Sequence, residues 1–388
     1  MIPPKSPPRP GEWPPFDGAI SLPIVRSTTF VAPSADAHRE RFRAHDGRFY
    51  QRFFHPTLDA AAQAVARLEG GEAGLVFSSG MGAISTTLVT LLKGGDHAVA
   101  HHEIFAQTKT FLTTILASYG VTTTFIDARN PAEIAAAIRP GTRLVYIETP
   151  SNPLLQVIDI AATARAVAGG PIEVVVDGTF ASPALQRPLE HGATIVVHSG
   201  TKYLGGHSDL MCGAVVARAE MIERIRRTQI FLGSVLDPEA AWLLHRGTKT
   251  LRLRVERQAA SALAVATRLR DHRLVAEVRY PFLPGTPEHA IAVRQMSGGG
   301  GVVSFEVEGG GAAARRFVDA LRLIPIATSL GGVETVAELP YDLDFDSSET
   351  GGDAKRGHVP GMVRLSVGLE DPPELIADLV QALDAITS

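Results

Sequence analysis

The clearest chemical signal in the sequence is a lysine that closely follows a short apolar segment. The stretch VVHSGTKYLGGH starts at Val196 and places Ser199 and Thr201 just before Lys202. Its apolar start predicts a strand, and ligands bind beyond the carboxyl ends of strands in open α/β sheets. Hydroxyl groups can hold a phosphate, and a lysine amine forms an imine with an aldehyde. The combination points to pyridoxal phosphate (PLP), although an ordinary surface lysine has the same local sequence.

Two further segments fit the same cofactor. The stretch VVVDGTF from Val174 is an apolar strand that ends at Asp177. A carboxylate beside a pyridine nitrogen keeps the ring protonated, and a protonated ring accepts electrons better. The stretch FSSGMGA places Gly80 and Met81 at the start of a predicted helix, where backbone N–H groups bind phosphate. The sequence contains no Gly-x4-Gly-Lys-Ser/Thr pattern, which excludes a Walker-type nucleotide loop.

These segments belong to a series that resembles one enzyme family. The resemblance is to the PLP-dependent enzymes of cysteine and methionine metabolism that include cystathionine γ-lyase, cystathionine γ-synthase and methionine γ-lyase. It extends from about Leu22 to Leu383. Eight matching segments occur in order: YQRFFHPT from Tyr50, SSGMGAI from Ser78, IETPSNP from Ile147, VVVDGTF from Val174, VVHSGTKYLGGHSD from Val196, RGTKTLRLR from Arg246, ATSLGGVET from Ala327 and VRLSVGLED from Val363.

The resemblance implies a role for each matching residue toward the cofactor. Lys202 would form the imine with PLP, and Asp177 would pair with the ring nitrogen. Asn152 would lie on the side of the cofactor's phenolic oxygen. The expected phosphate ligands are Gly80, Met81, Ser199 and Thr201.

The resemblance also implies contacts with the substrate and with a second subunit. Arg364 would bind the substrate α-carboxylate through its planar guanidinium, with Ser329 and Asn152 near the substrate. Tyr50 and Arg52 would reach the phosphate of a neighbouring subunit. A site of this kind is incomplete in a monomer, so the resemblance implies a homo-oligomer with shared active sites, typically a tetramer.

Several positions depart from the family pattern. Phe105 stands where the family has a tyrosine that stacks on the cofactor ring; a phenyl ring keeps the stacking but cannot transfer a proton. Gln107 replaces a glycine or cysteine, Gly178 an asparagine and His55 an asparagine. The segment PYDLDF over residues 340–345 adds carboxylates where the family has Pro-x-x-Met-Thr-His. The loss of the tyrosine hydroxyl puts ordinary cleavage of methionine or cystathionine in question.

The function expected from these residues is a PLP-dependent lyase. It would perform γ- or β-elimination on an amino acid with a side-chain leaving group, usually linked through sulfur. The alternative is a γ-replacement transferase that joins a nucleophile to an activated homoserine. Phe105 leaves open a specialised biosynthetic enzyme with an unusual leaving group, such as halide. A structural partner without activity is disfavoured because Lys202, Asp177 and Arg364 are all present.

The elements that must position these residues alternate between strands and helices. β-branched runs separated by helical stretches predict a mostly parallel sheet covered on both faces. In this part of the chain we expect helices over residues 58–68, 81–92, 106–118, 131–138 and 159–168, and strands over 97–100, 121–126, 143–148, 173–177, 193–198 and 213–217. Farther along we expect helices over 249–269, 312–321 and 374–386, strands over 302–307 and 362–367, and a loop over 340–358.

This pattern predicts an α/β protein with a second, smaller α+β unit. We expect an N-terminal arm over residues 1–56 that completes the neighbouring subunit's site, a large PLP-binding domain over 57–248 and a C-terminal domain over 249–388. The resemblance assigns this organisation to PLP fold type I, as in aspartate aminotransferase.

Composition narrows the class of protein and its surroundings. Of the 388 residues, 45% are hydrophobic, which is enough for a large core. The 37 basic and 41 acidic residues give a net charge of −4, so charge gives no reason to expect nucleic acid or an anionic membrane as partner. The longest apolar runs are far shorter than the about 20 residues of a spanning helix.

The cysteine and histidine content limits which disulfides and metal sites the protein can form. Cys212 is the single cysteine, so an intrachain disulfide and a cysteine-built zinc site are excluded. The proline-rich start lacks the apolar middle of a signal peptide, and we expect a cytoplasmic enzyme. His101 and His102 are adjacent on a predicted strand, which predicts side chains on opposite faces and no metal site.

Overall fold

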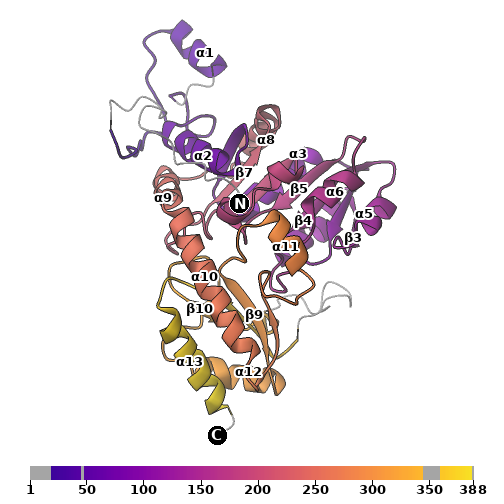
Figure 1. Ribbon diagram of the computed structural model, residues 1–388. Helices are drawn as coiled ribbons and strands as arrows, with labels where there is room; N and C mark the ends of the chain where they lie inside the picture. The colour runs from indigo at the N-terminus through magenta and orange to yellow at the C-terminus, as the bar shows by residue number, and fades with distance from the viewer. Residues whose placement is uncertain (1–18, 45–47, 344–358, 387–388) are drawn as a thin grey trace.

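A computed structural model describes residues 19–44, 48–343 and 359–386 (Figure 1). Its larger sheet has seven strands in the order β1-β7-β6-β5-β4-β2-β3. Neighbouring strands from β6 to β3 run parallel, and β7 runs antiparallel to both β1 and β6. The mostly parallel sheet expected from the sequence is therefore confirmed. Its strands are β1 (Ala73–Phe77), β2 (His97–His101), β3 (Thr122–Ile126), β4 (Thr142–Glu148), β5 (Glu173–Asp177), β6 (Ile195–Ser199) and β7 (Gly213–Ala217).

Helices cover both faces of this sheet because alternate strand residues are apolar on both sides. Val175 and Val197 pack with α3 and α8, whereas Val176 and Val196 pack with α5 and α6 on the opposite face. The elements between and after the strands are α2 (Pro56–Glu69), α3 (Gly80–Leu91), α4 (Ala106–Thr110), α5 (Pro131–Ala137), α6 (Ile160–Ala166), α7 (Ser182–Leu185), the 3-10 helix η2 (Pro188–His191), α8 (Ala219–Leu232) and α9 (Pro238–Thr248).

The helix expected over residues 106–118 differs from the prediction in its internal structure. Only its first turn, α4, is an ordinary α-helix, and it continues as a π-helical stretch, η1 (Phe111–Leu116). Thr113 and Thr114 donate their hydroxyls to backbone carbonyls one turn earlier. Such bonds compete with the regular helical pattern, and apolar spacing alone does not reveal them.

The C-terminal part of the chain forms a second sheet with the order β10-β11-β9-β8, antiparallel throughout. Helices α10, α12 and α13 lie together with this sheet in the lower part of Figure 1. The smaller α+β unit is thus confirmed, but the sequence did not predict strands β8 and β10. The elements are α10 (Leu251–Arg270), β8 (Val275–Arg279), α11 (His289–Gln295), β9 (Val302–Val307), α12 (Gly310–Asp319), β10 (Val336–Glu338), the 3-10 helix η3 (Pro340–Leu343), β11 (Met362–Ser366) and α13 (Pro372–Ala385).

The boundary expected at residues 248 and 249 falls at the end of α9 and stays a prediction. Much of the loop expected over residues 340–358, including Asp344 and Phe345, lies outside the described residues, and its first residues form η3. Asp342, one of the carboxylates expected near the substrate, instead pairs with Arg315 at 2.9 and 3.0 Å.

The N-terminal arm extends from the body of the protein at the top of Figure 1. It carries α1 (Ala35–Arg43), which the sequence did not predict and in which none of the nine residues is buried. Rings of Phe42, Phe49 and Phe53 pack against one another at centroid distances of 5.2 to 5.9 Å. The arm thus has its own aromatic cluster, and it also contacts the body, where Trp242 on α9 donates to the Leu22 carbonyl and Arg226 on α8 to the Phe53 carbonyl. The proline-rich residues 1–18 lie outside the described part.

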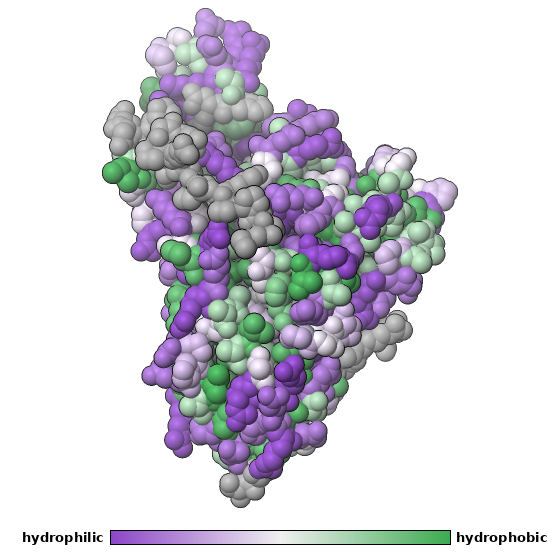
Figure 2. Space-filling view, in the orientation of Figure 1, coloured by the Kyte–Doolittle hydropathy of each residue, from purple (hydrophilic) through white to green (hydrophobic). Residues whose placement is uncertain are grey.

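The surface shown in Figure 2 carries hydrophobic residues scattered among hydrophilic ones, as is usual for the exposed side of a folded protein. Among the described residues, no helix combines the length and the apolar character needed to cross a bilayer.

Candidate active site

The predicted site residues gather where the parallel strands end. β4 ends at Glu148, β5 at Asp177 and β6 at Ser199, and the register pairs Glu148 with Asp177 and Asp177 with Val197. Parallel strands bring their carboxyl ends to one edge of the sheet, so these side chains come together there.

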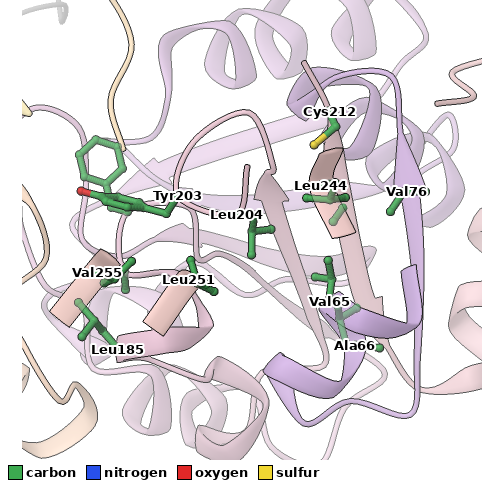
Figure 3. Packing of buried hydrophobic residues seen from close by; sticks show 14 of the residues in the cluster. Val65, Ala66, Val76, Leu185, Tyr203, Leu204, Cys212, Leu244, Leu251 and Val255 are labelled. Atoms are coloured by element: carbon green, nitrogen blue, oxygen red, sulfur yellow. The ribbon is translucent and has the colours of Figure 1, made fainter. Parts of the chain in front are cut away.

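Lys202 lies in a tight turn directly beyond β6. Its backbone N–H donates to the carbonyl of Ser199 at 3.2 Å, and its carbonyl accepts from Gly206 at 2.8 Å. The next two residues, Tyr203 and Leu204, are buried in the cluster shown in Figure 3. The packing of Tyr203 and Leu204 in this cluster therefore fixes the turn, and the Lys202 side chain extends from the turn into the site.

The Lys202 amine is set up for chemistry by its surroundings. Its Nζ donates to the Ser329 hydroxyl at 2.6 Å. Burial, together with the positive charge of Arg364, lowers the pKa of Lys202 to about 8. A lysine must be neutral to attack an aldehyde, so this environment makes the amine a far better nucleophile near neutral pH than a surface lysine.

Arg364 enters the site from the second sheet. On β11, its Nη1 donates to Asn152 Oδ1 at 2.9 Å and its Nη2 to the backbone carbonyl of Ser329 at 3.0 Å. Glu338, its direct neighbour on β10, forms an ion pair with the same guanidinium. The Nε atom of Arg364 is buried and has no hydrogen-bond partner among the residues that the structure describes. The structure thus brings the three predicted substrate residues together with Lys202 across the two sheets.

Ser329 connects the lysine to the arginine, and its backbone is unusual. Its φ of 86° lies in the left-handed region that residues other than glycine rarely adopt. Strained backbone of this kind concentrates at functional sites, where surrounding contacts hold it in place. Here the contacts are the Lys202 bond to the side chain and the Arg364 bond to the carbonyl.

Asp177 lies in a fully buried pocket of polar groups. Its Oδ1 accepts from the Thr179 backbone N–H at 3.0 Å, and its Oδ2 accepts from the Tyr146 hydroxyl at 3.3 Å. Burial raises the pKa of Asp177, and burial together with Asp177 raises the pKa of Glu148 well above its usual range. Asp177 and Glu148 place two buried carboxyl groups side by side on adjacent strands. Such a pair favours a cationic partner, such as a pyridinium nitrogen.

Phe105 is the N-cap residue of α4 and lies beyond the end of β2. Its backbone N–H donates to Glu148 Oε2 at 2.7 Å, and the same carboxylate accepts from the backbone of Asn152. Phe105 is 36% exposed as a residue, which leaves room for its ring to stack on a planar ligand. Glu148 thereby fixes two of the predicted residues at once.

The predicted phosphate ligands meet where the start of α3 contacts the end of β6. Ser79 caps the helix by accepting from the Gly82 N–H at 2.9 Å. A Cβ atom on Gly80 would lie 2.8 Å from the Ser199 Cβ, so the close approach requires glycine. The free N–H groups of Gly80 and Met81 and the Ser199 hydroxyl therefore lie near one another.

Thr201, also a predicted phosphate ligand, is engaged within the protein. Its hydroxyl donates to the Cys212 carbonyl at 3.2 Å and accepts from the Cys212 N–H at 2.9 Å. These two bonds fix the turn that carries Lys202.

Tyr50 and Arg52 are not brought to the other site residues within one chain. Arg52 donates to the Ile230 carbonyl at 3.0 Å, near the end of α8, and its guanidinium lies 5.6 Å from the Tyr50 ring centroid. Both side chains are exposed on the arm. A role toward a neighbouring subunit, as the resemblance implies, stays a prediction.

The expectation that His101 and His102 point to opposite faces of the sheet was wrong, whereas the expectation that they hold no metal stays a prediction. β2 ends at His101, so His102 leaves the alternating pattern, and the two ring centroids lie 4.5 Å apart. His101 Nε2 bonds to Gln156 Oε1 at 3.0 Å, and burial lowers the His101 pKa to about 4. The nearby carboxylate of Asp127 pairs with Arg129 at 2.6 Å. These bonds give His101 and Asp127 structural roles. His102 and Asp127 also line a cavity of about 400 Å³ between the two sheets.

Sequence reasoning missed three polar residues of the site: Tyr146, Glu148 and Glu338. Glu148 sits inside the matched segment IETPSNP from Ile147, and Tyr146 lies just before it. Aligning the carboxyl ends of the predicted strands β4 and β5 would have placed Glu148 beside Asp177. For Glu338 the signal was weaker, because its strand has three residues.

The residues present fit PLP. The buried acid pair suits a pyridinium nitrogen, the start of α3 suits a phosphate, Phe105 can stack, and the Lys202 amine is activated by burial. The orphaned Nε of Arg364 indicates an acceptor that belongs to the bound state. Together with the sheet order, this set defines a PLP-dependent enzyme of fold type I.

Comparison with known proteins agrees. The family model described as Cys/Met metabolism PLP-dependent enzyme matches residues 11–384, and the chain belongs to this family. It is 44% identical to an L-methionine gamma-lyase of Pseudomonas deceptionensis over 95% of this chain and 94% of that protein. It is 40% identical to a cystathionine gamma-lyase of Bacillus subtilis, with 95% of each chain covered.

A solved structure extends the comparison to the fold. The crystal structure of metB from Corynebacterium glutamicum superposes with a TM-score of 0.91 at 39% identity, covering 96% of this chain and 95% of the other. The family assignment and the cofactor expected from the sequence are therefore confirmed: the chain is a PLP-dependent enzyme of sulfur amino-acid metabolism.

Proposed function

We propose that this enzyme eliminates a sulfur-linked group from the γ-carbon of an amino acid, releasing a thiol, a 2-oxo acid and ammonia. The observation that carries the proposal is the Lys202–Ser329–Arg364 arrangement, in which a proton-transferring amine lies beside a carboxylate-binding guanidinium. The relatives named L-methionine gamma-lyase and cystathionine gamma-lyase support the same reaction.

Each residue has a distinct part in this reaction. When bound, PLP supplies an electron sink for the bonds that break next to the amino group. Arg364 orients the substrate through its α-carboxylate, and Lys202, once released from the cofactor, moves the α-proton. Asp177, held by Tyr146, would keep the proton on the ring nitrogen of bound PLP, and Phe105, whose backbone is held by Glu148, would stack against that ring.

The phosphate ligands complete the cofactor site. Gly80, Met81 and Ser199 hold the phosphate, with Thr201 fixing the turn between Ser199 and Lys202. Asn152 accepts from the Arg364 guanidinium and so positions it, and it would also contact the bound cofactor on its phenolic side. Tyr50 and Arg52 contribute from the neighbouring subunit.

Glu338 adds a constraint on substrate binding. Its carboxylate is ion-paired with Arg364, so an incoming α-carboxylate must share or replace this contact. The unpartnered Nε of Arg364 offers a donor for the second substrate oxygen. A buried acid in this position also disfavours a second anionic group on the substrate side chain at the same point.

Product analysis tests the reaction class. With L-methionine and L-cystathionine as substrates, we expect ammonia and 2-oxo acid to form in equal amounts with the released thiol. A replacement product without ammonia, in the presence of an activated homoserine and a thiol, would instead establish the transferase alternative. Pyruvate in place of a four-carbon 2-oxo acid would establish β-elimination.

Phe105 supports a second candidate, a specialised enzyme with a leaving group that departs without help from a phenol. A thiolate needs a proton as it leaves, whereas a halide does not. We expect Phe105→Tyr to raise kcat for thioether substrates by about tenfold, the lower range of general acid catalysis being about a hundredfold. Steady-state kinetics with methionine and with a γ-halogenated analogue measure the effect on kcat. If Phe105→Tyr changes neither the rate nor the preferred substrate, Phe105 does not determine the leaving group.

The proposed assembly is a homo-oligomer with shared active sites, of the tetrameric kind typical of the family, in the cytoplasm. The unburied helix α1 and the exposed Tyr50 and Arg52 support a neighbouring subunit that covers the arm. The single, buried cysteine is consistent with a reducing compartment.

A further inference from the structure

A buried phenol lies next to the acid that faces the cofactor. Tyr146 is on β4, two residues before Glu148 and therefore on the same face of the sheet. Its side chain is fully buried, and its hydroxyl donates to Asp177 Oδ2 at 3.3 Å. The Thr108 side chain, from α4, also hydrogen-bonds this phenol. The phenol thus lies between α4, the helix that follows Phe105, and the carboxylate at the end of β5.

Some groups around Asp177 favour its protonated form, and others favour its ionised form. Burial and the neighbouring carboxylate of Glu148 favour a proton on the acid pair. The Tyr146 hydroxyl and Thr179 donate hydrogen bonds to the carboxylate, and His198 on β6 acts on it in the same direction. In a site without water, each donated bond weighs heavily on which form of the acid is present.

Within the described part of the chain, Tyr146 hydrogen-bonds to Asp177 and Thr108, and to none of the residues proposed to bind the phosphate, the substrate carboxylate or the reactive amine. Its phenol itself stays protonated, because burial and the charge of Asp177 raise its pKa well above the usual range. It can therefore act on the reaction only as a hydrogen-bond donor to Asp177, strengthened by the bond it receives from Thr108.

We propose that Tyr146 is a positioning residue that orients the Asp177 carboxylate and keeps it ionised, and thereby keeps the proton on the pyridine nitrogen of the bound cofactor. This inference rests on the proposed function, in which Asp177 faces that nitrogen. Without the phenolic hydroxyl, Asp177 becomes more basic and draws the proton away from the ring. A neutral ring withdraws fewer electrons, so the cofactor's imine nitrogen becomes more basic and the ring a weaker electron sink.

The test compares Tyr146→Phe with Tyr280→Phe in the PLP-loaded enzyme. Tyr280 is equally buried, but its hydroxyl donates to the carbonyls of Ala259 and Gly300, away from Asp177. Titrating the near-visible absorbance of the bound cofactor gives the pKa of its imine. Because a hydrogen bond to a charged group shifts its ionisation by about one pH unit, we expect this midpoint to rise by about half to one unit in Tyr146→Phe. We expect kcat to fall about tenfold with little change in KM.

The control variant separates this effect from a loss of stability. Tyr280→Phe is expected to lower the melting temperature but to leave the absorbance midpoint at the wild-type value. Should Tyr146→Phe fail to fold, Thr108→Val removes the other bond of the phenol and is expected to move the midpoint upward by a smaller amount. In an Asp177→Asn background the effect of Tyr146→Phe on the midpoint is expected to vanish, since the two residues act through one contact.

Two outcomes overturn different claims. A midpoint and kcat unchanged by Tyr146→Phe, or shifted equally by Tyr280→Phe, would refute the positioning role while leaving the enzyme assignment intact. If the wild-type protein takes up PLP without any imine absorbance, the proposed function itself fails before Tyr146 is tested.

Discussion

Replacing Lys202 with alanine is expected to lower kcat by at least about 10,000-fold, because one side chain supplies both the covalent attachment and the proton transfer. Its amine is buried, has a lowered pKa and donates a hydrogen bond to the Ser329 hydroxyl at 2.6 Å. Borohydride reduction of the wild-type enzyme followed by peptide mass analysis is expected to find the cofactor fixed to Lys202. The Lys202→Ala variant is expected to bind PLP without forming a reducible imine.

Lys249→Ala serves as the matched control, because this lysine lies at the exposed end of α9 outside the site. It is expected to keep wild-type activity and the wild-type adduct. An adduct on any other lysine, or full activity in Lys202→Ala, contradicts the assignment of the site.

The same lysine makes a pH-dependent prediction. Since burial lowers its pKa to about 8, the neutral amine increases as pH rises through that value. The rate at which the cofactor-free protein forms the imine with added PLP is therefore expected to rise with pH and to level off above about 9, one unit beyond the pKa. A surface lysine would keep gaining rate up to about pH 10 and beyond.

The second large effect concerns the arm. Arg52→Ala is expected to weaken PLP retention by about a hundredfold, the loss expected for one charge-assisted contact to a phosphate. The reason is the proposed donation of Arg52 to a neighbour's phosphate, for which its position on the exposed arm is suited.

Mixing variants tests whether the sites are shared. The assay uses a PLP concentration at which the weakened sites of Arg52→Ala stay empty, so neither Arg52→Ala nor Lys202→Ala is active alone. When the two kinds of chain reassort at random, half of the dimers contain one chain of each kind. Each such dimer has one intact site, so about a quarter of wild-type activity is expected to return. The control mixture of Asp177→Ala and Lys202→Ala is expected to stay inactive, because both residues come from the same chain. No recovery in the first mixture means that each subunit builds its site alone.

The sequence predicted six of the seven strands of the larger sheet and missed β1 (Ala73–Phe77). Central strands such as VVVD up to Asp177 were predicted because they are buried on both faces and are continuous apolar runs. The strands β8 and β10 were missed for a physical reason. β8 is largely exposed and contains charged residues, and β10 has only three residues. Their pairing comes from the neighbouring strands rather than from their own composition.

The candidate site divides in the same way. Lys202 and Asp177 could be predicted because each follows its own apolar strand. Tyr146 could not, because its importance depends on the alignment of β4 with β5, which local sequence does not state. The meeting of Arg364 with Asn152 likewise joins two sheets that are far apart along the chain. Contacts of this kind follow from the resemblance to a family, not from periodicity.

Cys212 is fully buried in the cluster shown in Figure 3, and its backbone hydrogen-bonds to Thr201 in the turn that carries the reactive amine. Burial raises the pKa of its thiol, so the reactive thiolate is scarce as well as inaccessible. The native enzyme therefore presents no background to maleimide dyes. A cysteine introduced on α1 would therefore be the one site that a fluorophore labels, and the fluorophore would report movement of the arm. The rate at which Cys212 itself is labelled would measure how fast the core opens.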